Sequence, residues 1–257
     1  MRGRPGPGAA FLGAGAAIAS PCMNVFPNAG VAIVIGATGG IGAAMVERLG
    51  RDPAFAQVIA YGRSAANRLE ILDEASIAAA AEHANAAAGG RLTLVFDATG
   101  FLSDDRQAPE KRWRDLDAAA LQRSFALNAI GPALLMKHFL PLLPRTGKSV
   151  FATLSARVGS IQDNALGGWY GYRAAKAALN QLVRTAAVEL ARSRPDAICV
   201  ALHPGTTATR LSGPFAKAGL DVRPPDVAAD ELFGVLQGLD ATATGGFFDH
   251  HGAPIPY

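Results

Sequence analysis

The chain has 257 residues, half of them hydrophobic, and its 24 basic and 21 acidic side chains leave a formal charge of +3. One α/β core can account for this length, and a second domain has no room. The basic residues form no sustained stripe, and no apolar run free of Gly and Pro is long enough to cross a bilayer, so we expect neither nucleic acid nor a membrane as partner. The two cysteines, Cys22 and Cys199, form no disulfide framework, which fits a reducing cytoplasm.

Residues 1–22 are rich in Gly, Ala and Pro, and two arginines precede an apolar stretch. A secretory signal peptide has this order of residues, but two glycines interrupt the helix that such a segment would form. Met23 stands just ahead of the first expected strand, where a native start would lie. We therefore expect a disordered N-terminal tail at 1–22 and a folded domain at 23–257.

The first strong pattern is a β-branched apolar run at 31–35, followed by a glycine-rich loop and a helix at 41–49. The loop reads Gly36-Ala37-Thr38-Gly39-Gly40-Ile41-Gly42. Its glycines allow a sharp turn and let a pyrophosphate approach the N–H groups at the helix start, where the helix dipole favours negative charge. Such a loop is weak evidence by itself.

Strand-like runs then alternate with helical patterns along the whole chain. We expect strands at 31–35, 57–61, 69–72, 92–96, 149–154, 198–202 and 246–249, and helices at 41–49, 74–88, 115–140, 167–192 and 226–239. This alternation predicts a single α/β domain with a Rossmann-type, doubly wound parallel sheet, and it places ligands at the carboxyl ends of the strands. Cys199, inside one of these strands, is expected to be a small buried hydrophobe.

The expected helix at 115–140 contains Asn128 and, four residues later, Pro132. Proline has no N–H, so the carbonyl of Asn128 loses its intrahelical donor and the helix should kink there. A freed carbonyl needs another donor. A kink that only improves packing is the alternative interpretation.

The helix expected at 167–192 carries Tyr172 and Lys176, which lie on one face, one turn apart. A phenol has an ordinary pKa of roughly 10, and a nearby ammonium favours the phenolate and lowers that value. A tyrosine in this setting can exchange a proton with a carbonyl or an alcohol. Taken alone, the pair also fits a packed tyrosine with a solvated hydroxyl.

The Gly-x-x-x-Gly-x-Gly spacing at 36–42, together with Tyr172 and Lys176, resembles the short-chain dehydrogenase/reductase superfamily from Val31 to the C-terminus. The stretches at 157–161, 167–170 and 246–249 resemble its C-factor branch, named for an intercellular signalling protein. The resemblance implies an NAD(P)-dependent oxidoreductase that interconverts a carbonyl and an alcohol of a small substrate, and a homodimer or homotetramer. It also implies Tyr172 as the general acid or base and Lys176 as the residue that lowers the tyrosine pKa and holds the nicotinamide ribose.

Two further catalytic roles follow from the resemblance. Asn128 would hold a water that relays protons to the lysine. A serine three residues before a glycine would orient the substrate, but this position holds Ala156. We expect Ser155, one residue early, to take the role, with Ser160 in reserve.

Cofactor contacts are implied for the loops that follow several strands. They are Gly36, Thr38, Gly40, Ile41, Gly42, Arg63, Ser64, Gly100, Tyr172, Lys176, Pro204, Gly205, Thr206 and Thr209. Arg63 and Ser64 stand where an NAD-preferring site would carry an acidic residue, so they favour the 2′-phosphate of NADP, with NAD possible. The alternative is that Arg63 is an ordinary surface arginine. Members of the superfamily usually carry an aspartate beside the adenine, and here Glu70 or Asp73 would take that place.

The chain also departs from the superfamily pattern, which favours a rival function. Asp97-Ala98-Thr99-Gly100 replaces the usual Asn-Asn-Ala-Gly, so the sheet must be braced differently here. With Ala156, this change favours a cofactor-binding signalling or regulatory protein of C-factor type that catalyses little.

Residues 210–225 show no sustained periodicity, which is what we expect of a lid over a substrate. His250 and His251 are expected to be solvated, and no metal site is expected.

Overall fold

The computed structural model describes residues 26–211 and 222–257. The tail expected at 1–22 therefore lies outside the described residues, as does most of the lid expected at 210–225.

The fold is built on one sheet of seven parallel strands in the order β3-β2-β1-β4-β5-β6-β7. The strands are β1 (Gly30–Ile35), β2 (Phe55–Gly62), β3 (Asn67–Arg68), β4 (Leu92–Asp97), β5 (Ser149–Leu154), β6 (Ala197–His203) and β7 (Phe247–Asp249). The strand order reverses between β1 and β4, and such a switch point opens a crevice at the carboxyl ends of the strands. The predicted Rossmann-type, doubly wound sheet is confirmed.

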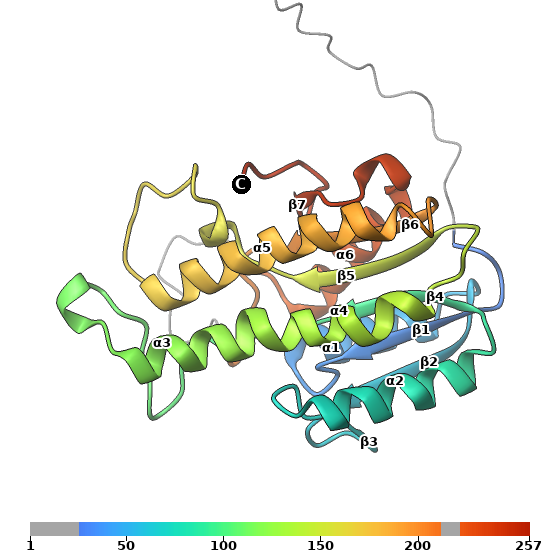
Figure 1. Cartoon of the computed structure of the whole chain (residues 1–257), viewed down its shortest axis with the longest axis horizontal. Coiled ribbons are helices and arrows are strands. Elements are labelled where there is room, and N and C mark those ends of the chain that lie inside the picture. The colour runs from blue at the N-terminus through green and yellow to red at the C-terminus, as the bar shows by residue number, and fades with distance from the viewer. Residues whose placement is uncertain (1–25, 212–221) are drawn as a thin grey trace, which may run out of the picture.

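Helices cover both faces of the sheet (Figure 1). They are α1 (Gly40–Gly50), α2 (Glu74–Ala88), α3 (Ala118–Phe125), α4 (Gly131–Phe139), α5 (Tyr170–Leu190) and α6 (Pro225–Gly238). Because side chains alternate along a strand, Ile33 packs into the layer of α2, α4 and α5, and Val34 packs into the layer of α1 and α6. The two layers bury both faces of the central strands, which explains their continuous apolar runs.

One expected strand was placed wrongly. The third strand has only two residues, 67–68, rather than 69–72. Leu69 and Ile71 are nevertheless buried, in the connection that leads to α2. Their apolar character therefore reflects core packing and not strand pairing.

The helix expected at 115–140 is interrupted at Asn128, as the position of Pro132 predicted. The α-helical segments α3 and α4 are joined by a π-helical turn, Ala126–Ile130, and the N–H of Gly131 donates to the carbonyl of Ala126, five residues back. One π turn inside a helix is often found at functional sites. Asn128 lies within this turn and is fully buried.

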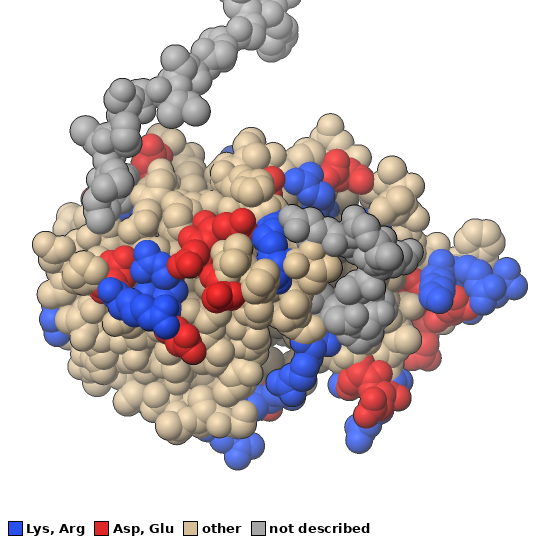
Figure 2. All heavy atoms as spheres, turned by 180° about the vertical axis from the view of Figure 1, so that it is seen from behind, with Lys and Arg blue, Asp and Glu red and all other residues tan. Residues whose placement is uncertain are grey.

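By length and composition alone, the stretch Ala118–Leu142 could cross a membrane. Here it packs against α2 and α5, and the core helix of a layered α/β domain meets the same criteria. On the face shown in Figure 2, acidic and basic side chains lie in mixed groups.

The expected homodimer or homotetramer stays a prediction. On the helices that carry Asn128 and Tyr172, two large apolar residues, Leu135 and Phe139, lie fully buried in the core. Ile130 in the π turn, and Leu182 and Val188 on α5, are exposed, so these apolar side chains would be available to such an interface.

Candidate active site

The glycine-rich loop connects β1 to α1 with very little space to spare. Gly36 has φ +81°, and a Cβ there would lie 3.0 Å from the carbonyl of Ala98. A Cβ at Gly42 would lie 2.2 Å from the carbonyl oxygen of Gly36. Any side chain at either position would therefore force the loop apart.

The N-terminus of α1 is suited to hold an anion. The helical hydrogen bonds begin with Ala43 N–H to the carbonyl of Gly39 at 2.9 Å, so the N–H groups of residues 40–42 precede the ladder. The N-cap, Gly39, has no side chain to cap them, and the first turn of α1 has no acidic residue. Free N–H groups and the positive end of the helix dipole together favour a phosphate at this point.

Segments far apart in the sequence meet at this helix start. A Cβ on Gly40 would lie 2.7 Å from Cγ2 of Thr209, so the segment after β6 lies directly against α1. A Cβ on Gly62 would lie 3.3 Å from Oγ1 of Thr38, which brings the loop to the end of β2, where Arg63 is exposed. The fold thus gathers three groups of the residues predicted to bind a cofactor.

The adenine side of the crevice is less well defined. Asp73 caps α2, because its side chain accepts a hydrogen bond from Ala75 N–H at 3.0 Å. Glu70 is half-buried between β3 and α2. Of the two acidic residues considered for the adenine, Glu70 is the one not used as a helix cap.

Tyr172 and Lys176 share one face of α5 beside the ends of β4 and β5. Lys176 is 2% exposed; its Nζ donates to the carbonyl of Leu154 at 2.8 Å and lies 5.8 Å from the ring centroid of Tyr172. A Cβ on Gly100 would lie 4.0 Å from the same Nζ. Glycine at this position therefore leaves room beside the ammonium.

The electrostatics of the pair differ from the prediction. Burial raises the pKa of Tyr172 above its ordinary value, and desolvation lowers the pKa of Lys176 to about 8, against an opposing effect of Asp97. Desolvation of the phenolate therefore outweighs the lowering that was expected from Lys176, whose ammonium donates to the carbonyl of Leu154. Tyr172 thus keeps its proton at neutral pH, and its role as general acid or base stays a prediction.

Asp97 braces the ends of β4 and β5 from a fully buried position. Oδ1 accepts from the N–H of Thr99 at 2.9 Å and from its hydroxyl at 2.6 Å, and Oδ2 accepts from Thr153 Oγ1 at 2.7 Å. Desolvation raises the pKa of Asp97, and these hydrogen bonds oppose the rise. The brace at this position therefore uses two hydroxyl donors in place of an amide.

Asp97→Ala should lower the free energy of unfolding by about 2–3 kcal/mol, because it leaves the buried hydroxyl of Thr153 and the half-buried donors of Thr99 without acceptors. Asp97→Asn should cost less than about 1 kcal/mol, since the amide oxygen still accepts and the Thr153 hydroxyl can turn to accept from the amide nitrogen. Urea unfolding of both variants measures the difference. Equal destabilisation by the two changes would contradict the described brace.

Asn128 holds the loop that follows β4. Its Oδ1 accepts from Phe101 N–H at 2.9 Å, and its Nδ2 donates to the carbonyls of Phe101 at 2.8 Å and Ser124 at 3.0 Å. All of these partners are backbone groups, so the amide fixes the loop beside Gly100. The predicted relay role, which needs a water on Asn128, stays a prediction.

The structure does not bring Ser155 into the crevice as a donor. Its hydroxyl is buried and donates to Oδ1 of Asn180 at 2.7 Å, two turns along α5 from Tyr172. Ser160 is also buried, and its Oγ accepts from Asp163 N–H at 3.1 Å. A serine that orients a carbonyl must donate its hydrogen bond to that carbonyl, and the Ser155 hydroxyl donates to Asn180 here, so this geometry does not support the role predicted for Ser155.

Sequence reasoning missed Glu110, which holds the start of α5. Its carbonyl accepts from Trp169 N–H at 2.5 Å, and its buried carboxylate accepts from Gly171 N–H at 3.1 Å. These bonds flank Tyr172 on the N-terminal side and stabilise the left-handed Trp169, with φ +52°. No local pattern could have indicated this contact, because 61 residues separate Glu110 from Gly171.

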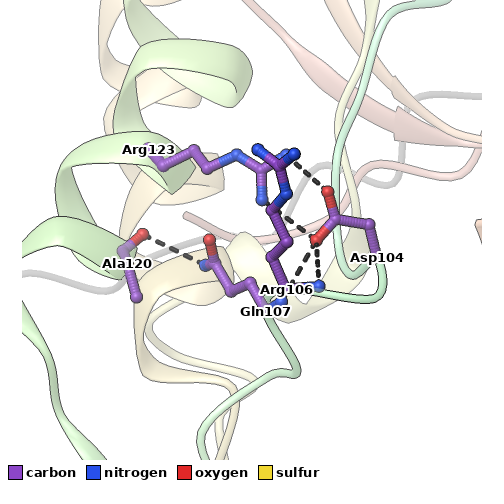
Figure 3. A network of polar contacts seen from close by, with 5 residues as sticks. All are labelled: Asp104, Arg106, Gln107, Ala120 and Arg123. Carbon is purple, nitrogen blue, oxygen red and sulfur yellow. Dashed lines mark hydrogen bonds and ion pairs between the residues drawn. The ribbon is translucent and has the colours of Figure 1, made fainter.

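A second unpredicted network fixes the loop after β4 onto α3 (Figure 3). Arg123 donates to both carboxylate oxygens of Asp104, at 3.0 and 2.5 Å, and these hydrogen bonds lower the pKa of Asp104 to about 2. Gln107 donates to the carbonyl of Ala120 at 3.1 Å. The loop at the crevice is therefore tied to a rigid helix at several points.

Comparison with known proteins identifies the family of this chain. A family model described as enoyl-(acyl carrier protein) reductase matches residues 13–221. The chain is 35% identical over 144 residues to C-signal of Myxococcus xanthus, which covers 56% of this chain and 82% of C-signal. The chain belongs to the short-chain dehydrogenase/reductase superfamily. The predicted resemblance, including its C-factor-like branch, is confirmed.

Several of the similar proteins carry the names of oxidoreductases. A 1-hydroxy-2-glutathionyl-2-methyl-3-butene dehydrogenase of Rhodococcus sp. (strain AD45) is 31% identical over 164 residues, 63% of this chain and 66% of that protein. The crystal structure of NADPH-bound carbonyl reductase from chicken fatty liver superposes with a TM-score of 0.79 at 25% identity, over 92% of this chain and 97% of that one. The fold and the relatives together assign this chain to the oxidoreductases of the superfamily.

Proposed function

We propose that the protein is an NADP-dependent reductase or dehydrogenase that interconverts a carbonyl and an alcohol of a small substrate. The observation that carries the proposal is the position of Tyr172 and Lys176 on one face of α5, beside Gly100 at the switch point of the sheet. NADPH in the chicken carbonyl reductase structure and NADP in a Burkholderia multivorans relative of the same fold support the choice of cofactor.

The residues present fit a dinucleotide. The uncapped N-terminus of α1 would hold the pyrophosphate, and Thr209 would close over it from the segment after β6. The exposed Arg63, with Ser64, would bind a 2′-phosphate at the end of β2. Lys176 would hold the nicotinamide ribose, with Gly100 leaving the room that this contact needs.

When bound, the reduced cofactor supplies a hydride to the carbonyl carbon. Tyr172, protonated at neutral pH because burial raises its pKa, would donate its proton to the carbonyl oxygen, so that an alcohol forms. The ammonium of Lys176 would then stabilise the phenolate that is left. Asn128 would keep the loop at Gly100 in place and, through its backbone carbonyl, support return of the proton.

Arg63→Ala should erase most of the preference for NADPH over NADH, because it removes the positive charge that is proposed to bind the 2′-phosphate. Fluorescence titration of each cofactor measures both dissociation constants. Arg51→Ala is a matched control, since Arg51 is an exposed arginine at the far end of α1 and should leave both constants unchanged. Tighter binding of NADH than NADPH by the unmodified protein would contradict the assignment.

A second candidate, a cofactor-binding regulatory protein that catalyses little, is favoured by one observation. By resemblance, Ala156 stands at the position of the substrate-orienting serine, and the hydroxyl of the neighbouring Ser155 donates its hydrogen bond to Asn180. The similarity to C-signal is consistent with that candidate. Detectable turnover separates the two functions.

A further inference from the structure

A polar cluster lies where β7 ends, apart from Tyr172 and Lys176. His250 and His251 directly follow β7, and Glu231 lies on α6. One ligand atom from each of these three side chains lies within 4.8 Å of the others. The cluster joins α6 to the segment that directly follows β7.

His250 is the unusual member of this cluster. It was expected to be solvated, but both of its ring nitrogens are buried and have no hydrogen-bond partner among the described residues. A neutral imidazole has one N–H donor and one lone pair, and each costs free energy when buried unsatisfied. The ring therefore offers a ligand atom that nothing in the described part of the chain uses.

We propose that Glu231, His250 and His251 bind one divalent transition-metal ion, of which Zn²⁺ fits the ligands best. Two imidazoles and a carboxylate, with one position left open, form a common tetrahedral zinc set. Metal bonds of about 2.0–2.2 Å place tetrahedral ligand atoms roughly 3.4 Å apart, so the three side chains need only small rotations to close on an ion. His203 stays outside the set, because its ring centroid lies 6.4 Å from that of His250.

Arg223 limits the affinity of this site. Its Nη1 lies 3.2 Å from Oε2 of Glu231, so the ion must share the carboxylate with a guanidinium. The main chain of Arg223 is paired with Thr206 and Ala208, at 2.9 and 2.8 Å, which fixes the guanidinium close to Glu231. We therefore expect reversible binding and not a permanently held structural ion.

Isothermal titration of the full, tag-free chain with Zn²⁺, after treatment with a chelator, tests the proposal. We expect one equivalent per chain, with affinity lowered at least about tenfold by His250→Gln and by Glu231→Gln. His138→Gln is the matched control, because His138 lies on α4 beside Glu74 and should bind as the unmodified chain does. Co²⁺ should give visible bands of a tetrahedral site in the unmodified chain and lose them in the two site variants.

His251→Asn provides a variant that should fold normally, because His251 is exposed. It should also weaken Zn²⁺ binding at least about tenfold. Unchanged Zn²⁺ affinity in His251→Asn and in a folded His250→Gln would overturn the proposal, as would an equal loss in His138→Gln. Neither readout involves NADPH or substrate, so the result is independent of the proposed enzymatic function.

Discussion

Tyr172→Phe should lower NADPH-dependent carbonyl reduction by at least about 100-fold, because it removes the hydroxyl that carries the proton while the ring keeps its packing. Positioned proton transfer is typically worth about 10²–10⁴-fold. The affinity for NADPH should barely change, since the hydroxyl is not among the groups that would hold the phosphates. Steady-state kinetics with a reducible carbonyl, and fluorescence titration of NADPH, measure the two effects separately.

Tyr170→Phe is the matched control for this change. Tyr170 begins the same helix and is 37% exposed, but it lies on a different face from Tyr172. It should retain near-normal turnover. If Tyr172→Phe also retained nearly all activity, the fold would stand, but the mechanism proposed for α5 would be wrong.

Lys176→Met should damage both turnover and NADPH binding, because the ammonium would serve the ribose and the phenolate together. Methionine keeps much of the aliphatic volume of this buried side chain, so lost packing is a smaller concern than with alanine. We expect kcat/KM to fall by at least about 100-fold. The dissociation constant of NADPH should rise as well, which distinguishes this variant from Tyr172→Phe.

The pKa of Lys176 predicts how the rate of reduction depends on pH. Desolvation lowers the pKa of Lys176 to about 8, so the ammonium is present below that pH and is lost above it. The kcat/KM for reduction should therefore fall as the pH rises through about 8. In Lys176→Met this fall should disappear; a fall of unchanged position and size would assign the titration to another group.

The sequence was sufficient to predict the fold. Strands that are buried on both faces are continuous apolar runs, so six of the expected strands lie close to their observed positions. The third strand was misplaced because two residues, 67–68, are too few to show a period. The proline at 132 predicted an interruption of its helix at Asn128 because the missing N–H is a local property.

Features that depend on tertiary contacts were not predictable in this way. The bonds from Glu110 to the start of α5, and from Asp104 to Arg123, join positions with no local signal. The pKa of Tyr172 depends on a balance between desolvation and a charge, and the sequence shows only the charge. The direction in which Ser155 points is set by the end of β5 and by Asn180 on α5, neither of which the motif describes.

Consumption of NADPH by the unmodified chain, with a set of ketones, aldehydes and quinones, tests the central claim most directly. The proposed function predicts that at least one compound oxidises NADPH and yields one equivalent of the alcohol, or hydroquinone, for each cofactor consumed. The dissociation constant of NADPH is measured on the same sample to show that the site is competent. Tight binding of NADPH without turnover of any compound would contradict the enzymatic function and favour the regulatory one.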